Sequence, residues 1–166
     1  MHALLMMLML DAAAQSAVPT PKWGQPVKNE RQGGPLGLGV ALGAPSGLAA
    51  KVWLGDWMAT QFSVGGDLGW LGDLSVTGDY LFHFRPLNTN NSEYSVPLYA
   101  GAGVNLSTNT IVLQDSIWFG FRAVFGATVL VRALPVDLYI ETAPTIYVLD
   151  EPTWAVDGQM GVRYYF

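Results

Sequence analysis

Residues 158–166, GQMGVRYYF, end the chain on an alternating pattern. Counting back by twos from Phe166 gives mainly apolar and aromatic side chains, whereas the residues between them include Arg163 and Gln159. Successive side chains of a β-strand point to opposite faces, so this period of two predicts a strand with one apolar and one polar face. Chain ends are usually polar and frayed, which makes an aromatic last residue on such a strand unusual.

The same alternation runs through the chain from Pro35 to the C-terminus. No helical period competes with it over a long stretch, and turn-like segments rich in Gly, Pro, Asn and Asp separate the runs. Eight strands are predicted, at about 36–43, 48–55, 58–70, 74–85, 96–106, 117–132, 136–148 and 154–166. The fold class that this pattern predicts is all-β, with an even number of amphipathic strands.

The composition is unusual for a water-soluble protein and excludes several classes of protein. Hydrophobic residues make up 51% of the 166 residues and charged residues only 13%, against about 25% charged in soluble domains. No run approaches the roughly 20 apolar residues of a membrane-spanning helix. The net charge of −5 argues against a nucleic-acid partner, which needs a basic surface. The absence of cysteine excludes disulfides and thiolate metal sites.

The N-terminus differs from the rest of the chain. A short apolar stretch followed by small residues predicts a secretory signal peptide over residues 1–17, although no Lys or Arg precedes the apolar stretch. A short N-terminal helix with no role in export is the alternative. Residues 18–34 contain three prolines and no apolar period, which indicates a flexible linker. The barrel is expected to occupy residues 35–166.

Two opposite architectures fit eight amphipathic strands. A soluble barrel turns its apolar face inward, whereas a transmembrane barrel turns it toward lipid. The apolar face here carries almost no ionisable residue. The other face mixes glycine and alanine with both signs of charge, as the narrow interior of an eight-stranded barrel requires. We therefore expect an eight-stranded antiparallel up-and-down transmembrane β-barrel with its polar face inside.

The final strand carries a resemblance to a known family. Apolar residues at alternate positions lead to a terminal aromatic residue, through Met160, Val162, Tyr164 and Phe166. This pattern resembles the small bacterial outer-membrane barrels of the OmpA membrane-domain and OmpX type. The resemblance implies insertion in the outer membrane by the assembly machinery, with these four residues as its signal. It also implies that the first strand begins and the last strand ends on the periplasmic side. The connection at 86–95 falls on the same side, although the family usually has short turns there.

The polar face predicts a network of charges inside the barrel, because buried ions must be paired. The candidate members are Lys51, Asp67, Asp79, Arg122, Asp137, Glu141, Asp157 and Arg163. Such a network would plug the lumen and favours a structural or interaction role. A narrow or gated channel for small solutes is the alternative, in which exchange of ion-pair partners would open a path.

An enzyme that modifies lipid is a second and weaker alternative. Ser75, Asp79 and His83 share one face of a strand, but positions four apart lie roughly 13 Å from each other at about 3.3 Å per residue, too far for a catalytic relay. Only one histidine follows the predicted leader, so neither a metal site nor a cofactor is expected. We expect a monomer without enzymatic activity, with outer-membrane lipid and the assembly machinery as its partners.

Overall fold

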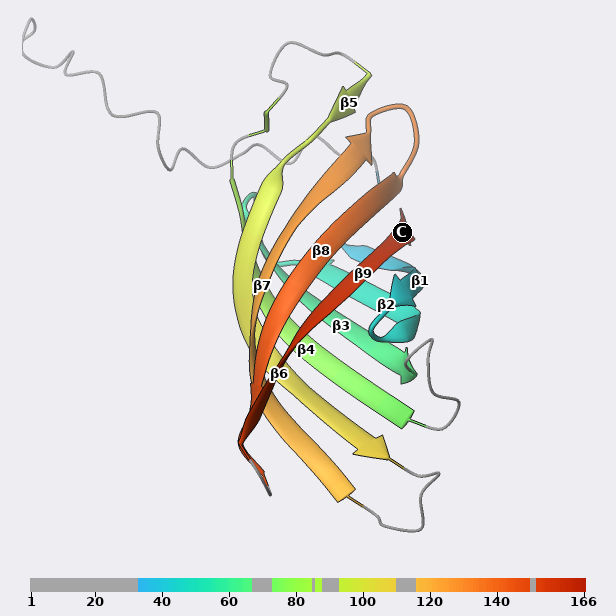
Figure 1. Cartoon of the computed structure of the whole chain (residues 1–166). Coiled ribbons are helices and arrows are strands. Elements are labelled where there is room, and N and C mark those ends of the chain that lie inside the picture. Colours follow the sequence, from blue (N-terminus) through green and yellow to red (C-terminus); the bar gives the residue numbers. More distant parts are fainter. Residues whose placement is uncertain (1–32, 67–72, 85, 88–92, 110–115, 150–151) are drawn as a thin grey trace, which may run out of the picture.

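The computed structural model describes residues 33–66, 73–84, 86–87, 93–109, 116–149 and 152–166. These residues form one closed antiparallel β-barrel of eight strands (Figure 1), which confirms the predicted fold class. The predicted signal peptide, all but the last two residues of the predicted linker, and Asp67 lie outside the described residues.

Nine strand elements build the sheet. In chain order they are β1 (Leu36–Gly43), β2 (Ser46–Trp53), β3 (Met58–Gly66), β4 (Asp73–His83), β5 (Tyr94–Ser95), β6 (Leu98–Asn109), β7 (Ser116–Val131), β8 (Val136–Tyr147) and β9 (Thr153–Tyr165). Each of the eight long strands pairs with its neighbours in sequence, and β9 returns to pair with β1. The topology is therefore up-and-down, and the sheet has no free long edge.

The short element β5 is an extension of β6. Tyr94 of β5 lies opposite Val131, and Leu98 of β6 lies opposite Ala127, so both strands advance four residues in the same register. Pro97 interrupts the ladder because it has no N–H, while its carbonyl still accepts a hydrogen bond from the Thr128 backbone at 3.1 Å. Part of the long connection at 86–95 is thus strand, and the count of eight barrel strands stands.

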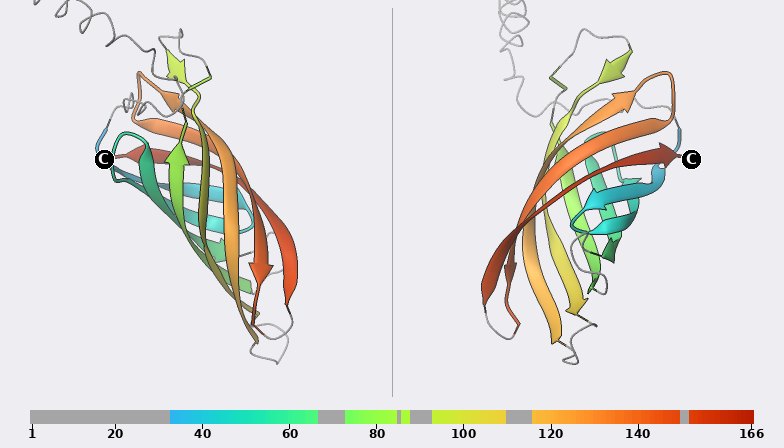
Figure 2. Two further views of the ribbon diagram at one scale, coloured as in Figure 1. Left: turned by 90° about the vertical axis from the view of Figure 1, so that its left-hand side faces the viewer. Right: turned by 45° about the vertical axis from the view of Figure 1, so that its right-hand side comes forward.

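The register fixes the tilt of the strands. A path across directly opposed residues starts at Gly37 and passes through Lys51, Gln61, Asp79, Gly103, Arg122 and Thr145 to Ala155. Gly37 itself pairs with Tyr165, ten residues further along β9. A stagger of ten residues over eight strands tilts the strands by roughly 40° to the barrel axis, and the tilt is visible in Figure 2.

The two ends of the barrel hold different connections. The C-terminus, β5 and the turn between β7 and β8 lie at one end (Figures 1 and 2), which we call the C-terminal end. The Ala44–Pro45 turn between β1 and β2 lies at the opposite end, which we call the distal end. An even number of strands requires this arrangement, because the chain enters and leaves the barrel at the same end.

Burial alternates along the strands with the polar residues inside. Outward positions of the described strand residues carry no Asp, Glu, Lys, Arg or His, and many of their large apolar side chains are exposed, such as Phe121 at 58% and Met160 at 54%. Inward positions hold buried Lys51, Arg122 and Arg163 among other polar groups. The barrel is apolar outside and charged inside, the reverse of a water-soluble barrel.

Three inward tyrosines lie over glycines of the adjacent strand. The directly opposed pairs are Tyr99 with Gly126, Tyr139 with Gly161 and Tyr165 with Gly37. A Cβ atom on any of these glycines would collide with the tyrosine ring, at 2.6 Å for Gly37 and Tyr165. The glycines on the inner face therefore provide the space in which large aromatic rings lie flat against the wall.

Replacement of Gly126 by alanine tests this packing. The added methyl group would displace the Tyr99 ring, and overpacking of this kind typically costs about 1–3 kcal/mol. We expect Gly126→Ala to lower the free energy of unfolding by that amount in urea titrations of the detergent-solubilised barrel, followed by circular dichroism. The matched control is Gly78→Ala on the outward face, where a Cβ would lie an ordinary 3.5 Å from Phe62. Equal stability of the two variants would contradict the packing role.

Candidate functional site

Part of the charged network lies along one row of directly opposed residues. Gln61, Asp79 and Arg122 share the row of directly opposed residues described above, with Gly103 between the last two. A Cβ atom on Gly103 would collide with Asp79 Oδ1. Because this position has no side chain, Arg122 Nε on β7 lies 3.2 Å from Asp79 Oδ1 on β4, across the whole width of β6.

Glu141 on β8 is the most highly connected residue of the network. Its carboxylate accepts hydrogen bonds from Gln61 Nε2 at 3.0 Å and from the Tyr99 hydroxyl at 2.7 Å. The Gln159 amide also donates to it, and Arg122 Nη2 lies 3.6 Å from Oε1. Hydrogen-bond donors from three strands, β3, β6 and β9, and the Arg122 guanidinium from β7 therefore converge on one buried carboxylate. Hydrogen bonds to an ionised group are among the stronger ones in proteins.

A second ion pair lies closer to the C-terminal end. Arg163 Nε donates to Asp137 Oδ1 at 3.0 Å, and the Tyr165 hydroxyl donates to Asp137 Oδ2 at 2.7 Å. The Arg163 guanidinium also lies 3.8 Å from the centre of the Tyr139 ring. Its Nη1 donates to Gln61 Oε1. Since the amide nitrogen of Gln61 donates to Glu141, this one glutamine joins the two ion pairs into a single network.

Lys51 lies in an aromatic part of the same interior. Its ammonium nitrogen is 2.8 Å from His83 Nε2 and lies over the rings of Trp53 and Tyr99, at 4.7 and 5.1 Å from their centres. An ammonium group can only donate, so His83 Nε2 accepts in this contact. Cation–π contacts of this kind compensate in part for the loss of water around a buried ammonium.

The network fills the middle of the lumen. Three cationic residues and three carboxylates balance in formal charge, and the exposed fraction of each of these residues is 0–4%. They are Lys51, Asp79, Arg122, Asp137, Glu141 and Arg163. The side chains of both ion pairs are fully buried. These charges are therefore paired within the protein and not with solvent.

The remaining predicted members lie elsewhere. Asp157 on β9 is half-buried near the distal end, where its Oδ2 accepts a hydrogen bond from the Thr145 hydroxyl at 3.0 Å. Asp67 lies outside the described residues. The structure thus brings six of the eight candidate residues into the interior core and sets Asp157 apart from the central ion pairs.

Sequence reasoning missed the uncharged members of the network. Alternation places Gln61, Gln159, Tyr99 and Tyr165 on the inner face, but the predicted network contains only charged residues. Their signal was present in the sequence, because an amide or hydroxyl at an inward position near buried charge must find a hydrogen-bond partner. Which carboxylate each one bonds depends on the register between strands.

The structure separates Ser75, Asp79 and His83. The Ser75 hydroxyl donates to Asn105 Oδ1 at 2.9 Å, Asp79 pairs with Arg122, and His83 contacts Lys51. The three side chains form no relay. Within the described part of the chain, no group of three His, Asp or Glu side chains is placed to hold a metal ion.

The fold and the network define a closed eight-stranded barrel with a filled, charged interior and an apolar outer surface. Comparisons with protein-family models, with curated proteins and with solved structures found no match. No helix in the described residues is long and apolar enough to cross a membrane.

A double-mutant cycle on Asp137 and Arg163 tests the energetics of the network. Arg163→Met leaves a buried carboxylate without its counter-charge, and breaking a buried pair in this way typically costs about 3–5 kcal/mol. The double variant Asp137→Leu with Arg163→Met removes both charges, so we expect it to be more stable than Arg163→Met alone. Urea unfolding of the four proteins in detergent measures these free energies. A single variant as stable as the parent protein would contradict the role of this pair.

Proposed function

We propose that this protein is an integral β-barrel of the bacterial outer membrane with a structural or interaction role and a plugged lumen. The observation that carries the proposal is the distribution of charge across the barrel wall. Six charged residues lie in the interior, while the described outward strand positions carry none. Only a surrounding apolar medium makes this arrangement favourable, because exposed apolar surface in water is costly.

The extent of the apolar surface supports the proposal. Outward apolar side chains are found on every long strand, for example Leu48 at 65% exposure on β2 and Ile146 at 61% on β8. Soluble monomers rarely expose contiguous apolar patches of more than a few hundred Å². Closure of the sheet also satisfies the backbone hydrogen bonds between neighbouring strands, which a lipid environment requires.

Strand dimensions agree with a membrane span. β6 and β8 each have 12 residues, and at a tilt of roughly 40° such a strand rises about 30 Å along the barrel axis. The apolar band of outer-membrane barrels is about 25 Å tall and is flanked by aromatic residues. Outward aromatic residues gather toward the C-terminal end, where Trp57 contacts Phe82 and Tyr164 contacts Phe166.

The final strand supports assembly in the outer membrane. Met160, Val162, Tyr164 and Phe166 all lie on the outward face of the end of β9, with exposed side chains. These are the residues through which the chain resembles the OmpA membrane-domain and OmpX barrels. Together with the predicted signal peptide at residues 1–17, these residues support a route in which the chain is exported and then inserted by the assembly machinery. In this orientation the C-terminal end of the barrel lies on the periplasmic side.

The filled interior favours a structural role over conduction or catalysis. The ion-paired side chains in the middle of the barrel are fully buried, and Ser75, Asp79 and His83 each contact a different partner. A gated channel is the second candidate, favoured by the state of Arg122. Its guanidinium nitrogens lie near two carboxylates but make no hydrogen bond of good geometry, so it is the least firmly held cation of the described ion pairs.

An arginine scan of the outer face tests the membrane location. Phe121→Arg places a charge in the middle of β7, which we expect to cost about 2–4 kcal/mol when the barrel is unfolded from lipid vesicles. Val136→Arg at the beginning of β8 is the control, with an expected cost of about 0–1 kcal/mol near the interface. In a water-soluble barrel both substitutions would be nearly neutral. A mature chain that stays folded and soluble without detergent or lipid would rule out the proposal.

Planar-bilayer recordings separate the plugged barrel from the channel. We expect no discrete conductance from the purified protein, because buried ion pairs fill the lumen. Arg122→Ala, which removes the least firmly held cation, provides the comparison. Stable openings in the parent protein that change in Arg122→Ala would favour the gated channel and reject the plug.

A further inference from the structure

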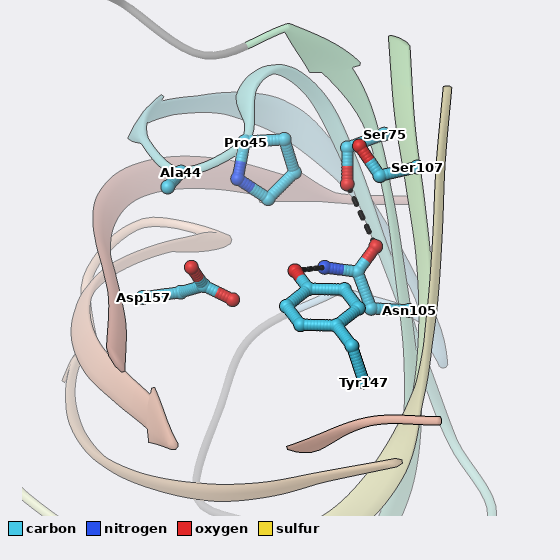
Figure 3. Close-up of a pocket in the computed structure, with 7 residues that line it drawn as sticks. All are labelled: Ala44, Pro45, Ser75, Asn105, Ser107, Tyr147 and Asp157. Carbon is cyan, nitrogen blue, oxygen red and sulfur yellow. Dashed lines mark hydrogen bonds between the residues drawn. The ribbon is translucent and has the colours of Figure 1, made fainter. Parts of the chain in front are cut away.

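A small polar cavity opens inside the barrel at the distal end. Side chains from four strands and the turn between β1 and β2 line it: Ala44, Pro45, Ser75, Asn105, Ser107, Tyr147 and Asp157 (Figure 3). Its volume is about 40 Å³, which is room for about three water-sized groups. The cavity lies between the distal mouth and the charged network, and it takes no part in the ion pairs that fill the lumen.

Hydrogen bonds hold the polar groups of this cavity in place. Asn105 Oδ1 accepts from the Ser75 hydroxyl at 2.9 Å, and Asn105 Nδ2 donates to the Tyr147 hydroxyl oxygen at 3.1 Å. Across the cavity, the Thr145 hydroxyl holds one carboxylate oxygen of Asp157 at 3.0 Å. Figure 3 shows the Asp157 carboxylate directed toward the Tyr147 hydroxyl. These groups are therefore fixed before any ligand binds.

The carboxylate in the cavity favours a cationic ligand over an anionic one. Among the described residues that line it, Asp157 is the one with a charged side chain. The network beneath is balanced in formal charge, with three cationic residues and three carboxylates, and Asp157 adds a carboxylate at the cavity itself. An anion would meet this carboxylate directly, whereas a cation would gain a charge-assisted hydrogen bond.

We propose that the distal cavity binds the primary ammonium group of a small amine. A primary ammonium group has three N–H donors and no acceptor, like the end of a lysine side chain. The cavity offers three kinds of acceptor: the Asp157 carboxylate, the Tyr147 phenol oxygen and the Ser107 hydroxyl. The small volume admits the ammonium group and one or two carbon atoms, with any longer chain directed to the mouth.

Divalent cations fit the cavity less well. Ca²⁺ takes six to eight oxygen ligands and usually several carboxylates, and Mg²⁺ requires a near-ideal octahedron. One carboxylate with neutral hydroxyl groups supplies too little negative charge for either ion. The polar lining also disfavours an apolar ligand, because its hydroxyl and amide groups would lose their contacts with water.

The proposal stands apart from the membrane location of the barrel. It depends only on the residues that line the cavity. Failure of amine binding would not change the argument from the charge distribution across the barrel wall. A soluble barrel with the same cavity would still bind the amine. The two proposals therefore fail in different experiments.

Nuclear magnetic resonance of the ¹⁵N-labelled barrel in detergent micelles tests the site. Methylammonium chloride is the probe, with sodium chloride and tetramethylammonium chloride as salts of equal charge. We expect methylammonium to shift the amide signals of Asn105, Ser107 and Asp157 in a saturable way. Tetramethylammonium, which has no N–H donor, should give no saturable shift.

Two variants and one control complete the experiment. Asp157→Asn should weaken methylammonium binding at least tenfold, and Tyr147→Phe should weaken it severalfold because it removes one acceptor. Glu93→Gln, the same carboxylate-to-amide change at the C-terminal end, should leave binding unchanged. Binding that Asp157→Asn and Tyr147→Phe both leave intact would overturn the proposal, and so would equal saturable shifts with sodium or tetramethylammonium.

Discussion

The pairing of β9 with β1 closes the barrel, and the arrangement of the interior depends on that closure. Its stagger of ten residues decides which inward side chains meet across the lumen, such as Gln61 with Glu141 and with Arg163. Gln61, Asp79 and Arg122 lie along one row of directly opposed residues, with Gly103 leaving a gap that the ion pair crosses. A shift of two residues in the pairing of β9 with β1 would preserve both faces of every strand and still separate partners such as Arg163 on β9 and Gln61 on β3.

Glycines on the inner face make room for the large side chains that contact the buried charges. Tyr99, Tyr139 and Tyr165 lie flat over directly opposed glycines, and their rings or hydroxyl groups then reach Glu141, Arg163 and Asp137. Gln61 links the two ion pairs because it donates to one carboxylate and accepts from an arginine of the other pair. The interior is therefore a connected polar core, in which removal of one partner leaves others buried without compensation.

The inverted distribution of polarity connects the fold with its proposed location. A barrel that buries its charges and exposes aliphatic and aromatic side chains is stable in a medium that cannot solvate ions. The plugged middle favours a structural role, and the cavity around Asp157 at the distal end adds a place where a small amine can bind without opening the lumen. These features occupy different levels of one barrel, so each can change independently of the others.

The sequence by itself determined the strands, their two faces and the barrel, because a period of two repeated eight times leaves few alternatives for a chain so rich in apolar residues. It also identified the buried charges, since both signs fall at inward positions. Only the tertiary structure decided the partners. Asp157 shares its face with Arg163 but lies apart from the central ion pairs. Gln159 contacts Glu141 from the neighbouring strand, whereas Gln61 reaches it from a strand 80 residues away in the sequence. Alternation fixes the face of a side chain, whereas stagger and closure fix its neighbours.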